Sequence, residues 1–293
     1  ISGFFGHSNL GDDLLLDLTI SLFSKGNELY IINPGSDLKE NDLLSDNIKI
    51  LRLSKKCLFK YNFDCIIYSG GGLFPSLHYP LRAFLGYTKS FLCVKRVIVL
   101  GCGIVPKKGI FSNFFFKLFL KSCSDVSVRD NVSKLYAERL LKKTISNIGD
   151  LYFSKKLVES ENRRENKTCL ICLCQPLIEL ELNDSRKKEK YDLFIERVNE
   201  IVSYIKSKGY SLTFLLFSKK YDRMLIDNLV MGGLDQSFSV VQEGKDFALG
   251  EIDSYMQQYE LALCMRFHSH VLCIRNNIPF ISICYDYKSW SLL

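Results

Sequence analysis

The stretch LALCMRFHSHVLCIRNNIPFISICYD, residues Leu261–Asp286, sets the pattern for the whole chain. An apolar run is followed by a helix-like piece over His268–Asn276, and a second apolar run follows that piece. Short, nearly continuous apolar runs are typical of parallel strands that are buried on both faces. The stretch therefore predicts a strand–helix–strand unit of a parallel α/β sheet.

The same alternation recurs along the chain. Helix-like pieces such as Asp12–Ser24 and Asn113–Lys121 separate the apolar runs of the first half, and the rhythm restarts with TCLICLC at Thr168. The runs of the first half are Ile1–Phe4, Leu29–Ile32, Ile48–Leu53, Cys65–Tyr68, Arg96–Leu100, Val126–Val128 and Ile145–Ile148. We therefore expect two Rossmann-like, doubly wound α/β domains that face a cleft, over residues 1–153 and 168–293, with a polar linker over 154–167.

Composition places the chain among globular proteins. Of 293 residues, 47% are hydrophobic and 24% are charged, which suffices for a sizeable core. The formal net charge of +7 suits an enzyme of anionic substrates or a protein that works near an acidic membrane surface. A nucleic-acid binder would concentrate lysine and arginine into a stripe, and the sequence has none, so we expect no nucleic-acid partner.

The chain has 11 cysteines, and several lie inside apolar runs. Cys169, Cys172 and Cys174 resemble a metal cluster, but no second pair or histidine follows at zinc spacing. We expect reduced core thiols in a cytoplasmic protein and no bound metal. No leader precedes the first apolar run, and no run reaches the roughly 18 residues that span a bilayer, so we expect neither a signal peptide nor a membrane-spanning helix.

The most apolar helix-like piece is IFSNFFFKLFLKS, residues Ile110–Ser122. It has more aromatic and aliphatic side chains than one helix face needs. Two interpretations stay open: a helix packed inside the first domain, or a helix at a partner or membrane face. Common burial of Phe114, Phe115, Phe116 and Phe119 within the monomer would favour the first.

Ligands of open α/β sheets bind beyond the carboxyl ends of the strands, so the residues after each run are candidates. The first run leads into GFFGHSNLGDDLLL, in which Asn9 and Asp12 are positioned to cap the next helix. The amino end of that helix would then attract an anion. The alternative is a simple glycine turn with an aspartate cap.

Two glycine-rich stretches follow later strands of the first half. In SGGGLF, Gly70, Gly71 and Gly72 would allow backbone N–H groups to approach a ligand closely. No Gly-Lys-Ser/Thr follows, so this is not a nucleotide-binding P-loop. The Gly-x-Gly in GCGIVP lacks the third glycine of the dinucleotide fingerprint.

Arg129 follows the run Val126–Val128 and opens RDNVS, a typical helix start. An arginine at a strand end suits bidentate recognition of a carboxylate or phosphate. The alternative is a salt bridge to a neighbouring carboxylate.

In the second half, MRFHSH and YDYK follow successive apolar runs. Neighbouring parallel strands end at one edge, so Arg266, His268 and Lys288 are expected to converge there. A lone histidine at this place would more often be a satisfied core residue. His270 lies one step further into the helix, where we expect it to cap or pack.

This ordered set of strand ends resembles the polysaccharide pyruvyl transferase family. The matching pieces are GFFGHSNLGDDLLL, SGGGLF, GCGIVP, SVRDNVS and MRFHSHVLCIRNNIPFISICYDYK. The resemblance implies a two-domain fold like that of the GT-B glycosyltransferases. It also implies transfer of the enolpyruvyl unit of phosphoenolpyruvate to sugar hydroxyls, with release of phosphate and formation of a pyruvate ketal.

The resemblance, carried over one motif at a time, implies that Arg129, Arg266 and Lys288 bind the donor's carboxylate and phosphate. It implies that His268 is the general acid. The first domain, with Asn9, Asp12 and the Gly70–Gly72 cradle, would take the acceptor, a sugar or a lipid-linked saccharide. A histidine suits proton delivery near neutral pH, and the donor anion would favour its charged form. The scheme needs no cofactor or metal, and it places the enzyme in the cytoplasm, at the inner face of the membrane when the acceptor is lipid-linked.

The chain departs from the family at its end, because KSWSLL follows soon after Lys288 where further helices are usual. We therefore expect a truncated C-terminal domain. Two rival functions stay open: a GT-B glycosyltransferase that uses a nucleotide sugar, and a non-catalytic sugar-binding member of the fold. The Glu-x7-Glu match over Glu243–Glu251 contains two glycines, so we interpret it as a chance match in a loop.

Overall fold

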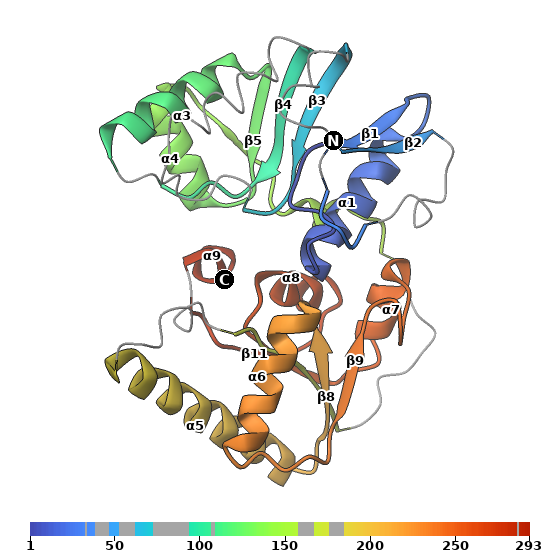
Figure 1. The fold of residues 1–293 in the computed structure, drawn as a ribbon, viewed down its shortest axis with the longest axis vertical. Coiled ribbons are helices and arrows are strands. Elements are labelled where there is room, and N and C mark those ends of the chain that lie inside the picture. Colours follow the sequence, from blue (N-terminus) through green and yellow to red (C-terminus); the bar gives the residue numbers. More distant parts are fainter. Residues whose placement is uncertain are drawn as a thin grey trace. The chain divides into compact units, whose positions relative to one another are not determined.

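The chain divides into two compact α/β units, each of which is described by itself (Figure 1). The computed structural model describes residues 1–32, 34–38, 47–52, 62–72, 94–106, 109–157, 167–175, 185–285 and 287–293. Unit 1 comprises Ile1–His7, Asp12–Lys155 and Leu292, and unit 2 comprises Ser8–Gly11, Lys156–Ser291 and Leu293. Most of the predicted linker, 154–167, lies outside the described residues. The grouping of Ser8–Gly11 with unit 2 was not expected from the sequence.

Strands and helices alternate in the first part of the chain, as the apolar runs predicted. The elements are α1 (Leu10–Phe23), β1 (Leu29–Ile32), β2 (Ile48–Leu51), β3 (Phe63–Ser69), β4 (Val94–Cys102), α3 (Ile110–Ser122), β5 (Asp125–Val128), α4 (Asn131–Leu141), β6 (Ser146–Asn147) and the 3₁₀ helix η3 (Leu151–Ser154). The described strands pair in parallel, β1 with β2 and β3 through β6 in sequence order.

Residues Ile1 and Ser2 join these two groups of strands. The amide of Ile32 donates to the carbonyl of Ile1 at 2.9 Å, and the amide of Ser2 donates to Ile67 at 2.8 Å. The predicted strand over Ile1–Phe4 is therefore shorter than expected, since the chain turns at Gly3. The resulting order, β2, β1, Ile1–Ser2, β3, β4, β5, β6, is the Rossmann order, which reverses direction beside Ile1–Ser2.

One face of this sheet is covered by α3 and α4. Phe116, Phe119 and Leu120 of α3, with Ala137 and Leu141 of α4, form one core cluster with alternate residues of β3, β4 and β5. The packing is helped by Tyr136 of α4, which stacks on Phe116 and donates to Asn113 of α3 at 2.6 Å. Burial of these apolar side chains is the main force that holds the layers together.

Unit 2 repeats the alternation. Its elements are β7 (Thr168–Cys172), α5 (Ser185–Ser207), β8 (Ser211–Leu216), α6 (Lys219–Met231), β9 (Ser239–Gln242), the 3₁₀ helix η5 (Leu249–Glu251), α7 (Ile252–Met256), β10 (Leu261–Cys264), α8 (Phe267–Arg275), β11 (Phe280–Ser282) and α9 (Tyr287–Leu292). The strand–helix–strand unit expected over Leu261–Asp286 is thus present as β10, α8 and β11.

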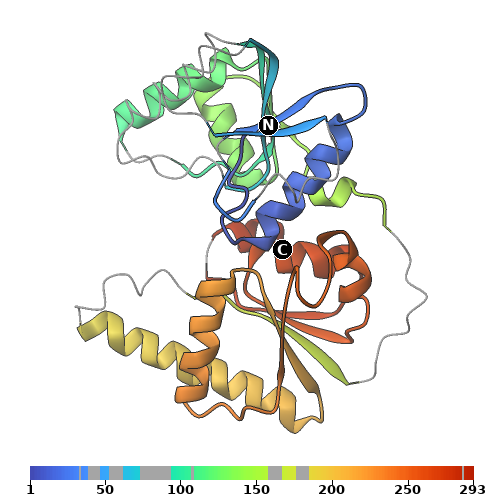
Figure 2. The same ribbon diagram turned by 45° about the vertical axis from the view of Figure 1, so that its right-hand side comes forward.

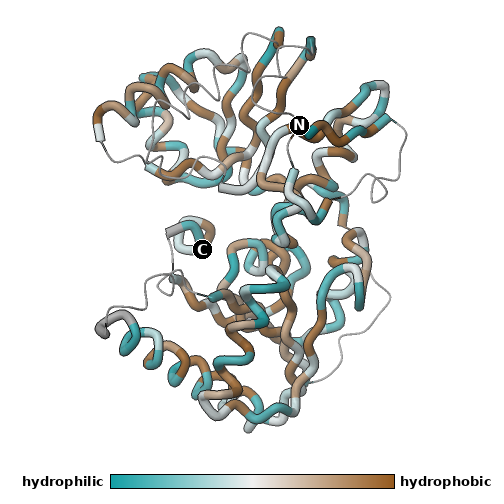
Figure 3. The backbone as a smooth tube through the Cα atoms, in the orientation of Figure 1, coloured by the Kyte–Doolittle hydropathy of each residue, from teal (hydrophilic) through white to brown (hydrophobic). Residues whose placement is uncertain are grey.

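The described strands of unit 2 form one parallel sheet in the order β11, β10, β7, β8, β9. This is again the Rossmann order, with the reversal between β7 and β10. The helices α5 and α6 pack on one face (Figure 2). On α5 the buried residues recur at helical spacing, and Figure 3 shows the matching alternation of brown and teal.

Both units therefore have the parallel α/β architecture that the sequence predicted. In the described part of the chain, no helix is both long and apolar enough to cross a membrane. Glu243 directly follows β9 and Glu251 ends the 3₁₀ helix η5, so the two do not lie on one long helix, which agrees with the interpretation of their spacing as a chance match.

Candidate functional site

The carboxyl end of β10 lies at the strand reversal of unit 2. β10 pairs with β7 up to Cys264 and Cys172, and the amide of Met265 then donates to the carbonyl of Cys172 at 2.9 Å. Arg266 is the next residue and the N-cap of α8, with extended backbone angles. An open α/β sheet binds its ligand at such a reversal, so Arg266 occupies the position where the fold expects one.

The backbone of Arg266 is held from several sides. Its carbonyl accepts hydrogen bonds from the amide and hydroxyl of Ser269, at 3.1 and 2.6 Å, and lies 2.8 Å from Nδ1 of His270. His270 is fully buried, and its Nε2 lies 2.7 Å from the hydroxyl of Ser282 on β11. A carbonyl only accepts, so Nδ1 donates and Nε2 accepts from Ser282. This confirms the predicted packing role of His270.

The guanidinium of Arg266 is paired with Asp222 in the first turn of α6. Nη2 of Arg266 contacts Oδ1 of Asp222, while Oδ2 accepts from the amides of Phe217 and Ser218 at 2.9 and 2.8 Å. The helix α6 begins at Lys219, three residues before Asp222. The Asp222 carboxylate turns back to the two amides that precede the helix, so it stabilises the entry to α6 and also positions Arg266.

Burial shifts the titration of both partners. It raises the pKa of the Asp222 carboxyl above its ordinary value, against the opposing effect of Arg266 and the two amides. Burial alone lowers the pKa of Arg266, but Asp222, Cys174 and Tyr285 raise it, and the net change is upward. Arg266 therefore stays charged.

Within the described part of the chain, part of the hydrogen-bonding capacity of Arg266 is not used. Its Nε is buried and has no hydrogen-bond partner among the described residues. A guanidinium has five N–H groups in a planar fork that matches carboxylate and phosphate geometry. A buried donor without a partner costs about 1–3 kcal/mol, so an anion that accepts from Nε would recover that cost on binding.

His268 is the second residue of α8 and is 8% exposed. Its ring packs edge-to-face on Phe267 and lies directly against Gly11, where an added Cβ would come within 2.0 Å of Nδ1. Gly11 belongs to the Ser8–Gly11 segment of unit 2, which is fixed by a 2.8 Å hydrogen bond from Leu10 to the carbonyl of Phe217. The ring is thus covered by a backbone segment that leaves no space for a side chain.

Lys288 lies in α9, after β11. β11 runs parallel to β10 and ends beside it, so the chain leaves both strands at the same edge of the sheet. Lys288 is half-buried, and Asp286 of the YDYK motif lies outside the described residues. Unit 2 therefore brings Arg266 and His268 to the strand reversal, whereas the approach of Lys288 stays a prediction.

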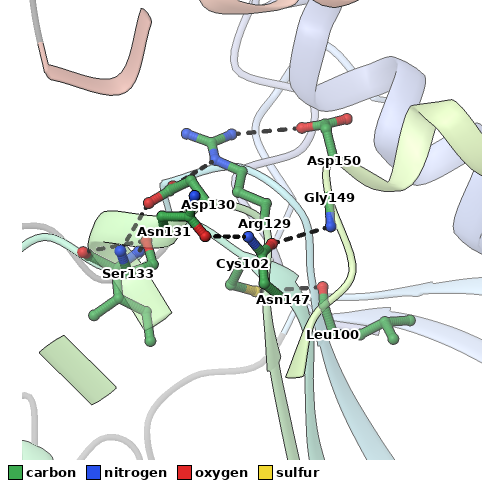
Figure 4. A network of polar contacts seen from close by, with 10 residues as sticks. Leu100, Cys102, Arg129, Asp130, Asn131, Ser133, Asn147, Gly149 and Asp150 are labelled. Atoms are coloured by element: carbon green, nitrogen blue, oxygen red, sulfur yellow. Dashed lines mark hydrogen bonds and ion pairs between the residues drawn. The ribbon is translucent and has the colours of Figure 1, made fainter. Parts of the chain in front are cut away.

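Arg129, in unit 1, has a different environment (Figure 4). It follows β5, and its side chain is 2% exposed. Nε lies 3.7 Å from Oδ2 of Asp130, and Nη1 lies 3.7 Å from Oδ2 of Asp150. The guanidinium crosses Gly103, where an added Cβ would come within 2.7 Å of Nε. These two carboxylate neighbours are what the alternative interpretation, a salt bridge at Arg129, requires.

Both carboxylates also support local structure. Asp130 is the N-cap of α4 and accepts from the amide of Ser133 at 2.7 Å, and Asp150 accepts from the amide of Tyr152 at 3.0 Å at the start of η3. The three charged groups sum to a net charge of −1, which opposes the approach of a further anion. Donor binding by Arg129 stays a prediction.

The glycines of SGGGLF lie at the strand reversal of unit 1. Gly70 and Gly71 have φ angles of +67° and +59°, in the left-handed region that favours glycine. A Cβ on Gly71 would come within 2.5 Å of Oδ1 of Asp12, and one on Gly70 within 2.5 Å of Leu15. The close approach that these glycines permit is therefore to α1.

The predicted cap residues of α1 lie at its amino end. Asn9 directly precedes the helix, and Asp12 and Asp13 are in its first turn. Asp13 accepts from the amide of Gly6 at 2.8 Å, which closes the glycine turn before the helix. The roles of Asn9, Asp12 and Gly70–Gly72 toward an acceptor stay predictions.

Among the described residues, no group of three or more His, Cys, Asp or Glu side chains is arranged to hold a metal. The nine described cysteines are all free. Burial raises the pKa of Cys169 to about 12, as it does for Cys102 and Cys123, so these thiols stay protonated at neutral pH. A protonated core thiol is a poor metal ligand.

Comparison with known proteins gives one family and a shared fold. The family model described as "Polysaccharide pyruvyl transferase" matches residues 9–287. No curated protein matches the sequence.

Two solved structures illustrate the fold. The UDP-GlcNAc 2-epimerase from Methanocaldococcus jannaschii has a TM-score of 0.51 and 13% identity, over 96% of this chain and 82% of that chain. The structure of accessory secretory protein 1, 2 and 3 of Streptococcus pneumoniae has a TM-score of 0.41 and 11% identity, over 75% of this chain and 41% of that one. The first likeness supports the GT-B-like fold class.

Proposed function

Because the chain belongs to the polysaccharide pyruvyl transferase family, we propose that it transfers the pyruvyl unit of phosphoenolpyruvate to a sugar of a surface polysaccharide or of its precursor. The product would be a pyruvate ketal, and phosphate would be released. The observation that carries the proposal is the Arg266 guanidinium at the strand reversal of unit 2, with a buried Nε that no described residue accepts from.

Arg266 and Lys288 are the proposed donor ligands in unit 2. Phosphoenolpyruvate carries a carboxylate and a phosphate, and the arginine fork can donate two parallel hydrogen bonds to either group. Asp222 fixes one edge of the fork, so the guanidinium is already oriented when the donor arrives. Such pre-orientation lowers the entropic cost of binding.

His268 is the proposed general acid. It would deliver a proton to the methylene carbon of the donor while C2 gains oxocarbenium character. One acceptor hydroxyl then adds to C2, phosphate leaves with the C2–O bond electrons, and a second hydroxyl closes the ketal. The two acceptor hydroxyls release two protons. One returns to His268, and the other leaves with phosphate.

The resemblance also assigns Arg129 to the donor. We retain this assignment as a proposal, although the two carboxylates beside Arg129 compete with any further anion. Asn9, Asp12 and Gly70–Gly72 are proposed to lie on the acceptor side, and the acceptor is a sugar or a lipid-linked saccharide. The free thiols of the described cysteines support a reducing, cytoplasmic compartment.

Phosphate release tests the proposal. The full chain is mixed with phosphoenolpyruvate and a panel of candidate saccharides, and inorganic phosphate is measured with and without each acceptor. We expect acceptor-dependent release and a raised melting temperature with phosphoenolpyruvate. A melting temperature that rises with UDP-sugars and not with phosphoenolpyruvate would contradict the proposal and favour a nucleotide-sugar transferase. Donor binding without release for any acceptor would favour a non-catalytic sugar-binding protein.

A further inference from the structure

The helix α3 is apolar on two opposite sides. Phe116, Phe119 and Leu120 are buried in unit 1. A second set is exposed, at fractions of 86%, 75%, 53% and 36%, and comprises Ile110, Phe111, Phe114 and Leu118. The four phenylalanines 114, 115, 116 and 119 are therefore not buried together, so the condition that would favour a helix packed inside the first domain is not met.

The exposed residues form one continuous stripe, the α3 stripe, which we define as Ile110, Phe111, Phe114 and Leu118. At 100° per residue they fall within an arc of about 100°. The buried residues centre on the opposite side of the helix, so the α3 stripe faces directly away from the core of unit 1. Figure 3 shows long brown segments along this helix, unlike the alternation of α5.

The charged side chains of α3 itself have one sign. Lys117 and Lys121 are one turn apart, at the edge of the stripe on the same helical projection, and α3 has no acidic residue. The whole chain carries a formal net charge of +7. Lysine stems lie along apolar surface while their ammonium groups reach outward, as at a membrane interface.

We propose that the α3 stripe docks on the surface of a bilayer that contains anionic lipids. An amphipathic helix with exposed phenylalanine and leucine and with lysines at its edge lies in the plane of the interface, with its apolar side chains among the acyl chains. The 13 residues of α3 are too few to span a bilayer, which requires about 20. Net positive charge on the chain and lysines at the stripe favour lipids with negative headgroups. The docking is independent of the proposed pyruvyl transfer.

Vesicle sedimentation with the full chain tests this inference. Phosphatidylcholine vesicles are compared with vesicles that contain 30% phosphatidylglycerol, at low and high salt. We expect binding to the anionic vesicles to exceed binding to the neutral ones about tenfold or more, and to weaken as salt rises. The double variant Phe111→Ser/Phe114→Ser should lose tenfold or more of the binding, and Lys117→Gln/Lys121→Gln should lose the preference for anionic vesicles.

A matched control is available in unit 2. Met231 is 78% exposed and lies at the end of α6, so Met231→Ser removes an exposed apolar side chain elsewhere and should leave vesicle binding unchanged. Since Phe111, Phe114 and Met231 are exposed, their variants should keep the melting temperature of the parent chain. The inference is overturned if neither vesicle binds, or if the phenylalanine variant binds as the parent does. It is also overturned if sedimentation velocity shows that the α3 stripe instead joins two copies of the chain.

Discussion

Arg129 and Arg266 occupy equivalent positions in their two sheets, but their surroundings differ. Each follows a parallel strand of a Rossmann-ordered sheet and begins the passage into a helix. Arg129 lies beside two carboxylates, those of Asp130 and Asp150, and its side chain is 2% exposed. Arg266 lies beside one carboxylate, that of Asp222, and its side chain is 20% exposed.

The position of each strand in the sheet accounts for the difference. β5 lies two strands from the reversal of unit 1, so the residues after it are enclosed by β4, β6 and their loops. β10 forms one side of the reversal in unit 2, where the connections that follow the two neighbouring strands run to opposite faces of the sheet. A strand-end arginine is therefore a ligand candidate when it lies at the reversal, and elsewhere its default role is structural.

The largest expected effect is on catalysis at the strand end that carries Arg266, and it concerns His268. His268→Ala should lower the turnover number by roughly 10²–10⁴-fold, the usual contribution of general acid catalysis, with little change in donor affinity. Phosphate release measures the first and calorimetry the second. His270→Ala is the matched control, because it removes the bonds to Arg266 and Ser282 and should lower the melting temperature. Near-normal turnover of His268→Ala with a verified acceptor would show that His268 is structural.

The next largest effect concerns Arg129, the arginine that lies beside two carboxylates. Arg129→Met removes the guanidinium that lies beside the buried carboxylates of Asp130 and Asp150, so the free energy of unfolding should fall by about 3–5 kcal/mol. Denaturant unfolding measures this loss. Gly103→Ala should cost less, because its Cβ would displace the guanidinium without removing the charge. If Arg129→Met unfolds like the parent chain and binds phosphoenolpyruvate more weakly, Arg129 is a donor ligand and the comparison between the two arginines fails.

Arg266→Ala should weaken donor binding about 10- to 100-fold, because hydrogen bonds to charged groups contribute roughly 1.5–3 kcal/mol each. Arg266→Lys retains the charge and loses the fork, so its affinity should lie between those of Arg266→Ala and the parent chain. Calorimetry with phosphoenolpyruvate at two salt concentrations separates charge from geometry. An unchanged affinity in both variants would remove Arg266 from the donor site.

The smallest effect is a pH dependence at Asp222. Burial raises the pKa of this carboxyl, so the folded protein holds the proton more tightly than the unfolded chain does. The contribution of Asp222 to stability is therefore complete below the ordinary pKa of an aspartate and is lost as the pH rises through the raised value. Melting temperatures of the parent and Asp222→Asn between pH 3.5 and 7 should diverge in favour of Asn as the pH rises. Parallel curves would contradict the raised pKa.

Short-range patterns predicted the fold well. Apolar runs and helix-like pieces located β10, α8 and β11, and most of α3, because hydrophobic periodicity is a property of neighbouring residues. The order of the strands was not predictable in this way, because the pairing of β10 with β7 joins residues about 90 positions apart. Nor was the grouping of Ser8–Gly11 with unit 2.

The candidate site was predicted in part for the same reason. The residue types at the strand ends indicated Arg266 and His268, and the fold places both at the reversal. Asp222 was missed as a partner because it lies 44 residues before Arg266, and no local pattern signals such a pair. Asp150, the second carboxylate beside Arg129, follows 21 residues later and was missed in the same way.

The membership of Ser8–Gly11 in unit 2 has a consequence for synthesis of the chain on the ribosome. The contacts of these residues with Phe217 and with the ring of His268 form only after the chain has grown by a further 206 and 257 residues, counted from Gly11. At about 5–20 residues per second this takes roughly 10–50 s. The surroundings of His268 are therefore completed only after residue 268 has been made. A fragment that starts at residue 156 would lack them altogether, so loss of activity after cutting the chain there would report the missing segment as well as the missing first unit.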